Sequence, residues 1–131
     1  MATAPAYAST INLGSGLVPA TLDTSLTAPT NVTTIVTGGS SGTKIEEIIF
    51  QGVGTTVAGV VNVFLYDGST YHLYDQVLVA AVTSSTTAIA FRTTRQYANL
   101  FLKDNTWTLR VSTTVAGLQS MVKVTATGGS I

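Results

Sequence analysis

Short runs of β-branched and aromatic residues alternate with turn-forming Gly, Ser, Thr and Asp along most of the chain. Such runs predict strands joined by turns, and their close spacing is typical of an antiparallel sandwich or barrel. We predict an all-β fold of about eight strands, with one helical turn within residues 90–98. The predicted strands are residues 31–37, 44–51, 60–66, 71–81, 87–91, 99–102, 106–113 and 121–126.

The first 29 residues do not show this pattern. Pro5, Pro19 and Pro29 oppose helical and central-strand structure, and no period of 2 or 3.6 residues persists there. We therefore divide the chain into an extended N-terminal arm, residues 1–29, and a β-sandwich domain, residues 30–131. A flexible tail is the alternative, but single apolar residues along the arm are spaced like anchors for a neighbouring surface. These candidate interface residues are Ile11, Leu13, Leu17, Leu22 and Leu26.

The strongest hairpin signal is the turn sequence DGST at residues 67–70, which lies between two apolar runs. A four-residue loop would create the cross-strand pairs Tyr66–Tyr71, Phe64–Leu73 and Asn62–Asp75. Both faces of the hairpin then carry large apolar side chains, whereas a surface strand normally buries one face. We expect one face to enter the core and the other to be covered by the arm, a loop or a partner. A register slip of one residue would exchange the two faces.

Residues 106–113 show the clearest alternation in the chain. Trp107, Leu109 and Val111 fall on one face of the predicted strand, and Thr108 and Arg110 fall on the other. Because Trp107 is the only tryptophan and lies on the apolar face, we expect it to anchor the core.

Polarity in this chain comes from hydroxyl groups rather than from charges. There are 24 Thr and 11 Ser among 131 residues, whereas 9% of the residues are charged and six Lys/Arg balance six Asp/Glu. Zero net charge argues against nucleic acid and anionic membrane surfaces as partners, because both attract a basic excess. The longest apolar stretch, residues 57–66, is interrupted by Asn62 and is too short to span a membrane. Neutral hydroxyl-rich strands cost little to desolvate, so the composition favours a surface that another protein covers.

Candidate catalytic and metal-binding residues are few. The absence of cysteine excludes disulfides, thiolate metal sites and thiol catalysis. His72 is the only histidine and lies in a predicted strand, while Glu46 and Glu47 are adjacent and should point to opposite faces. The glycine-rich residues 38–42 precede Lys44 but lack phosphate-loop spacing and are followed by a predicted strand. We therefore predict no catalytic residue, no cofactor and no metal, and hence no enzyme.

Aromatic residues gather around the hairpin turn: Tyr66, Tyr71 and Tyr74, together with His72. Tyrosine is common in subunit interfaces and at the edges of cores, which is our first interpretation of this group. The alternative is a sugar-binding face, in which the rings stack on a sugar and Asp67 accepts hydrogen bonds from its hydroxyl groups.

Several segments of the chain resemble small virion structural proteins of tailed bacteriophages. They are TKIEEI at residues 43–48, AGVVNVFLYDGS at residues 58–69, WTLRVST at residues 107–113 and the Gly128-Gly129 ending. The resemblance covers roughly residues 30–129, and the arm only loosely. The matching segments are turn and strand signatures without catalytic content.

This resemblance implies a capsid decoration or cement protein with an eight-stranded β-sandwich of jelly-roll type. Such a protein is made in the cytoplasm of the bacterial host and is located in the virion, on the capsid surface. The implied partner is the major capsid protein, and the implied assembly is a homo-oligomer, with a trimer favoured. The protein would clamp neighbouring capsid subunits through its arm and one sheet face.

The resemblance carries over no site residue, because it implies an interface and no active site. The candidate interface therefore consists of the arm residues named above and the hairpin tyrosines. A carbohydrate-binding module of a phage tail fibre or adhesin, using Tyr66, Tyr71, Tyr74 and Asp67, is the alternative function. An enzyme that uses His72 ranks third.

Overall fold

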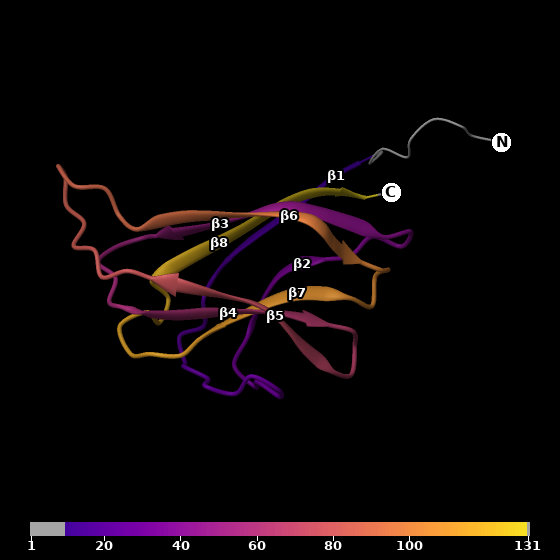
Figure 1. Ribbon diagram of the computed structural model, residues 1–131, viewed down its shortest axis with the longest axis horizontal. Coiled ribbons are helices and arrows are strands. Elements are labelled where there is room, and N and C mark those ends of the chain that lie inside the picture. The colour runs from indigo at the N-terminus through magenta and orange to yellow at the C-terminus, as the bar shows by residue number, and fades with distance from the viewer. Residues whose placement is uncertain (1–9, 131) are drawn as a thin grey trace.

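Two four-stranded antiparallel sheets form a sandwich in the computed structural model of this chain, which describes residues 10–130 (Figure 1). The described residues contain no helix, so the predicted all-β class and the sandwich are confirmed. The strands are β1 (Thr10–Leu17), β2 (Thr33–Thr37), β3 (Thr43–Gly52), β4 (Gly59–Tyr66), β5 (Tyr71–Val79), β6 (Arg92–Leu102), β7 (Thr108–Thr113) and β8 (Val122–Ser130). Residues 1–9 of the predicted arm lie outside the described residues.

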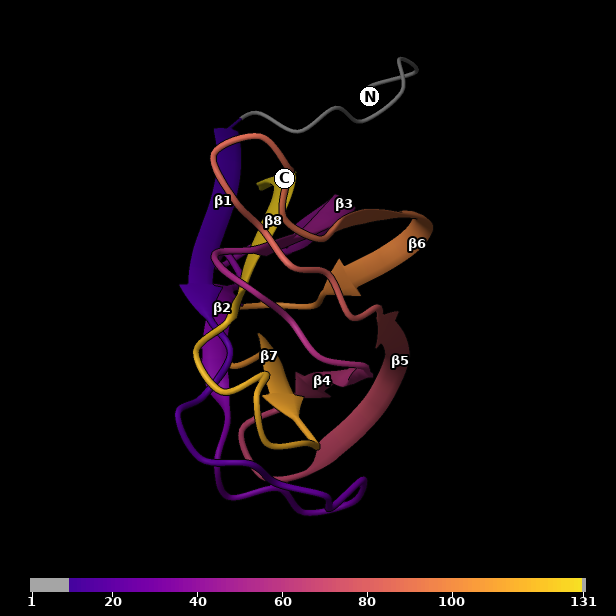
Figure 2. The same cartoon turned by 90° about the vertical axis from the view of Figure 1, so that its left-hand side faces the viewer.

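The two sheets are built mainly from strands that are far apart in the sequence. Sheet A has the strand order β1-β8-β3-β6, and sheet B has the order β2-β7-β4-β5. Among the described strands, β4 and β5 are the one consecutive pair that is hydrogen-bonded as a hairpin. Figure 2 shows β1 and β2 along one side of the sandwich and β5 and β6 along the other. The termini of the described chain meet because β1 pairs with β8.

Alternating apolar side chains from both sheets fill the space between them. Ile45, Ile48 and Phe50 of β3 and Val61 and Val63 of β4 belong to one buried cluster. Burial of each side chain of this size contributes about 1.5–3 kcal/mol. Ile45 and Ile48 are an odd number of residues apart, so a regular strand would point them to opposite faces. A β-bulge between Ile45 and Glu47 corrects the alternation.

Strand β1 lies within the segment that we predicted as an arm. It pairs antiparallel with β8 along its whole length, and the following Val18 is buried in the core, so the sandwich begins before residue 30. Alternation did not reveal this strand, because Gly14 and Gly16 occupy positions that are normally filled by larger apolar residues. A methyl group at Gly14 would overlap the carbonyl oxygen of Ile35 in β2. The glycine therefore permits the backbones of β1 and β2 to approach closely.

The predicted helical turn within residues 90–98 is wrong, because Arg92–Leu102 form β6. The predicted strand at residues 87–91 is also wrong, since residues 80–91 form a loop with one isolated bridge between Val82 and Thr56. β6 is an edge strand with mostly exposed side chains, and its pairing with β3 is interrupted by a bulge. Both features remove the alternation of apolar and polar residues by which a strand is recognised.

The hairpin forms with the predicted four-residue loop. Tyr66 lies opposite Tyr71 and Phe64 lies opposite Leu73, as predicted. The predicted pair of Asn62 with Asp75 is wrong. A β-bulge leaves Tyr74 without a partner on β4, so the pairs beyond it are Asn62–Gln76 and Val63–Asp75. One extra residue in one strand thus changes which side chains share a face.

Trp107 lies immediately before β7, where it is half-buried and packs against the core. Leu109 and Val111, which share its predicted face, are fully buried. The apolar face of this segment was therefore identified correctly, but its tryptophan lies at the margin of the core.

Candidate interaction surface

Three of the predicted anchors lie in one row on the outer face of β1. Ile11 is 79% exposed, Leu13 is 60% exposed and Leu17 is 41% exposed. Because they occupy alternate positions of a strand, their side chains point away from the core on the same face. We call these three residues the β1 apolar row. Exposed aliphatic side chains in such a row cost hydration free energy that only contact with another surface recovers.

The surroundings of the β1 apolar row are almost uncharged. On β8, the register places Gly129 opposite Ile11, Thr127 opposite Leu13 and Lys123 opposite Leu17. Between them, the hydroxyl groups of Ser15 and Thr125 share a hydrogen bond of 3.0 Å. Among the described residues of β8 that lie opposite the row, Lys123 is therefore the one charged residue. A partner could cover this half of sheet A without burying more than that charge, which keeps the desolvation penalty small.

The other two arm anchors are not part of this row. Leu22 is half-buried and Leu26 is exposed, and both lie in the loop between β1 and β2. Figure 2 shows this loop beyond the sheet B end of the molecule, away from the outer face of β1. The five predicted anchors therefore divide into three on β1 and two in the loop.

Asp23 holds this loop in shape. Its carboxylate accepts hydrogen bonds from the backbone N–H groups of Asn31 (3.0 Å), Ser25 (2.9 Å) and Thr30 (2.7 Å). These three donors, that of Asn31 first, lower the pKa of Asp23 below its usual value. The backbone N–H of Asp23 also donates to the carbonyl oxygen of Thr113 (2.9 Å), which ties the loop to β7.

Two of the hairpin tyrosines are engaged within the fold. The ring centroids of Tyr66 and Tyr71 are 4.3 Å apart, and the Arg110 guanidinium lies 4.3 Å from the Tyr66 centroid. Arg110 Nη1 donates to the Tyr71 hydroxyl (2.9 Å), and the Tyr66 hydroxyl donates to the carbonyl of Gly68 (3.0 Å). Beside this stack, Phe64 is fully buried on the outer face of sheet B. Both rings and both hydroxyl groups therefore already have partners in the protein.

Tyr74 is separated from this stack. It lies at the β5 bulge, is 40% exposed, and has its ring centroid 5.6 Å from that of Tyr97 on β6. The predicted group of three tyrosines is thus not brought together. Sequence reasoning missed Tyr97, because its segment was predicted to be helical. The alternation of Arg95 and Tyr97 on an edge strand was the available signal, and it was too short to recognise.

Asp67 and His72 meet at the hairpin turn. The Asp67 carboxylate accepts hydrogen bonds from the backbone N–H of Thr70 (2.7 Å), from His72 Nε2 (3.0 Å) and from the backbone N–H of Ser69 (2.9 Å). These donors, that of Thr70 first, hold the pKa of Asp67 far below its usual value. The His72 ring also stacks on Trp107, with centroids 6.0 Å apart. Asp67 is thus occupied in stabilising the turn.

Metal-binding clusters and the glycine-rich loop were the two remaining candidates for chemistry in the described part of the chain. Residues 10–130 contain no group of three or more His, Asp or Glu side chains that could hold a metal ion. The sequence GGSSG at residues 38–42 has the spacing Gly-x-Ser-x-Gly, which is typical of a nucleophilic serine between a strand and a helix. Here it joins β2 to β3, so no helix follows the serine.

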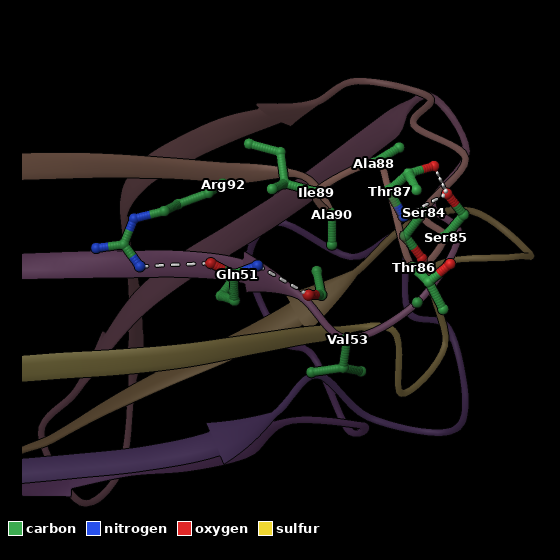
Figure 3. A pocket seen from close by; sticks show the side chains of 12 residues that line it. Gln51, Val53, Ser84, Ser85, Thr86, Thr87, Ala88, Ile89, Ala90 and Arg92 are labelled. Atoms are coloured by element: carbon green, nitrogen blue, oxygen red, sulfur yellow. Dashed lines mark hydrogen bonds between the residues drawn. The ribbon is translucent and has the colours of Figure 1, made fainter.

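An open hollow of about 610 Å³ lies at one end of the sandwich, between residues 84–90 and the end of β3 (Figure 3). Its rim carries the hydroxyl groups of four consecutive Ser and Thr residues, and Ile89 is 88% exposed there. Arg92 Nη1 donates to Gln51 Oε1 (3.3 Å) across its floor. Arg92 is the one charged residue among those that line the hollow.

No family model and no curated protein matches the chain. No helix in residues 10–130 is long and apolar enough to cross a membrane.

Proposed function

We propose that this chain is a structural virion protein, a capsid decoration or cement protein that binds the surface of a tailed-phage head and stabilises the shell. The observation that carries the proposal is the β1 apolar row, whose three side chains are exposed on a nearly uncharged face. The resemblance of residues 43–48, 58–69 and 107–113 to phage virion proteins supports the major capsid protein as the partner.

The strand pairing supports a sandwich of jelly-roll type. β1 pairs with β8, β2 with β7, β3 with β6, and β4 with β5. The eight strands are thus nested antiparallel pairs around the central hairpin, which is the winding expected when a long hairpin rolls into two sheets. Jelly rolls are common in viral capsid proteins, so this inferred topology agrees with the proposed function.

Weak contacts are sufficient for a protein of this kind. Each side chain of the β1 apolar row can contribute about 1–2 kcal/mol when it is covered, since it is already partly buried. One such surface binds weakly, but a homo-oligomer, here proposed to be a trimer, contacts the shell at several points. The later contacts form at high effective concentration, which multiplies the affinity without new chemistry.

The test is binding of the full chain to purified heads of its parent phage from which the protein has been removed. We expect the variant Ile11→Ser/Leu13→Ser/Leu17→Ser to co-sediment with heads about a hundredfold more weakly than the wild type. The matched control is Val53→Ser/Leu78→Ser/Ile89→Ser, which removes three exposed aliphatic side chains outside the row.

The control variant should bind as the wild type does. Equal binding by the β1 variant and the wild type would overturn the proposed surface. Failure of the wild type to bind these heads would overturn the capsid proposal itself.

A further inference from the structure

The β1 apolar row ends beside two positively charged side chains on the outer face of sheet A. The register aligns one residue from each of the four strands, which lie together in Figure 1: Leu17, Lys123, Gln51 and Arg92. The residues before and after Lys123 on β8 are buried, so the lysine side chain points to the outer face. We call these four residues the cationic row.

The opposite end of the same face is electrically balanced. There the register aligns Ile11 with Gly129, and Gly129 with Lys44 of β3. Lys44 Nζ lies 3.4 Å from Glu46 Oε1, so this positive charge has its counter-charge within the chain. A partner that covers Ile11 therefore needs no charge of its own at this end of the face.

The charges of the cationic row have no such counter-charge. Arg92 Nη1 donates to Gln51 Oε1 (3.3 Å), which is a neutral acceptor. Within residues 10–130, no carboxylate forms an ion pair with Lys123 or with Arg92. Neighbouring strands are about 4.8 Å apart, so the backbone positions of Lys123 and Arg92 are separated by about 10 Å across β3. A single acidic group above Gln51 can therefore interact with both charges.

Covering the β1 apolar row brings these charges into the contact. A partner that covers Leu17 also reaches Lys123, because the two residues are directly paired. Removing an ammonium group from water without an opposite charge is more unfavourable than covering one aliphatic side chain is favourable. A carboxylate on the partner offsets this cost, and the attraction between the two charges is stronger in the drier contact than in water. The Leu17 end of the row therefore selects the charge of its partner.

We propose that the outer face of sheet A binds a protein surface on which an aliphatic ridge ends in one or more carboxylates. The ridge covers the β1 apolar row, and the carboxylates lie above Gln51, between Lys123 and Arg92. Because the two ends of the face differ in charge, the acidic end of the partner fixes its direction along β1. This inference rests on the proposed function, since it describes the surface that the β1 apolar row meets on the head.

The first test is co-sedimentation of the full chain with heads at rising salt concentration. Wild-type binding should weaken from about 0.01 M to about 0.15 M NaCl, because the Debye length falls from about 30 Å to about 8 Å. At low salt, Lys123→Glu should bind about tenfold more weakly than the wild type, and Lys123→Gln about threefold. The matched control is Lys103→Glu, which makes the same change of charge at an exposed residue just after β6 and should bind as the wild type does.

The second test uses no heads. The full ¹⁵N-labelled chain is titrated with octanoate, whose alkyl chain ends in a carboxylate, and with octylammonium, whose alkyl chain ends in a cation. We expect octanoate to cause saturable shifts of the Leu17 and Lys123 amides with millimolar affinity, and octylammonium to cause none. Lys123→Glu should weaken octanoate binding about fivefold, whereas Lys103→Glu should leave it unchanged.

The two tests separate this inference from the proposed function. Equal binding of Lys123→Glu and the wild type to heads would overturn the inference and leave the proposed function intact. Failure of the wild type to bind heads would overturn the proposed function, and the titration then decides the inference. No saturable shift with octanoate, equal shifts in Lys123→Glu, or equal binding of octylammonium would overturn the inference whatever the heads show. Thermal unfolding of each variant checks that the fold is kept.

Discussion

The two sides of the sandwich connect sheet A to sheet B by different means. On one side, β1 and β2 approach so closely that Gly14 has no room for a side chain beside Ile35. On the other side, β5 and β6 are connected through Asp75, Arg95 and Tyr97. We call the first the glycine seam and the second the side-chain seam.

The difference shows what each side can offer to a partner. Backbone contact in the glycine seam leaves the alternate side chains of β1 free to point outward, and these form the β1 apolar row. In the side-chain seam, the two sheets are connected by side chains instead: Asp75 of β5 contacts Arg95 and Tyr97 of β6. The first side therefore exposes an apolar surface, whereas the polar groups of the second side bind one another across the two sheets.

The largest expected effect is that of Gly14→Ala in the glycine seam. Its methyl group would overlap backbone atoms of Ile35, which cannot move without shifting β2. We expect the free energy of unfolding to fall by about 3 kcal/mol, measured by urea denaturation. Gly16→Ala is the matched control on the same strand, because the nearest atom is the Thr33 methyl group at 3.0 Å, which has more freedom to move. An equal loss of stability in both variants would contradict a backbone contact specific to Gly14.

A smaller effect is expected from Asp75→Ala in the side-chain seam. The change removes the acceptor of the Tyr97 hydroxyl and the partner of Arg95, and we expect a loss of about 2 kcal/mol in the free energy of unfolding. Glu46→Ala is the matched control, since its carboxylate lies 3.4 Å from Lys44 on an open surface. Such an exposed pair is worth at most about 1 kcal/mol. A loss no greater than that of Glu46→Ala would show that the seam is held without these polar contacts.

The smallest effect concerns the stability of the side-chain seam at alkaline pH. Burial, followed by the hydrogen bond to Asp75 and its negative charge, raises the pKa of Tyr97 above its usual value. Its contribution to stability is thus complete below about pH 10, the usual pKa of tyrosine, and is lost as the pH rises toward the folded-state pKa. Tyr97→Phe should cost about 1 kcal/mol at pH 7, because the half-exposed hydrogen bond is screened by water.

The measurement is the free energy of unfolding from pH 7 to pH 11 for the wild type and Tyr97→Phe. The gap between the two proteins should narrow above about pH 10, while Gly14→Ala should stay a constant amount below the wild type. If the difference in the free energy of unfolding between the wild type and Tyr97→Phe is the same at pH 7 and pH 11, ionisation of Tyr97 does not destabilise this seam.

Local sequence patterns predicted the parts of the fold that depend on neighbouring residues. The DGST turn specified the hairpin and its first pairs, Tyr66–Tyr71 and Phe64–Leu73, because a short loop limits the possible registers. The alternation before Thr113 identified Leu109 and Val111 as buried residues of β7, although Thr108 and Ser112 on the opposite face are buried as well. Ile11, Leu13 and Leu17 are exposed, and their position on a paired strand was not predicted.

The features that the sequence did not reveal arise from contacts between distant segments. β1 has glycine at positions where a strand normally has large inward side chains. The reason for Gly14 is visible only in the folded protein, where the backbone of β2 lies against it. The bulges at Tyr74 and Tyr97 have no local signature, and they alone bring these two rings together.

From its sequence alone, this protein could be assigned an all-β class, a nearly uncharged surface rich in hydroxyl groups and a central hairpin, because composition and short-range alternation determine these properties. Tertiary structure decided which apolar residues remain exposed and which tyrosines meet. Those outcomes depend on strand order, register and bulges, and a shift of a single residue in pairing moves a side chain from one face of a sheet to the other.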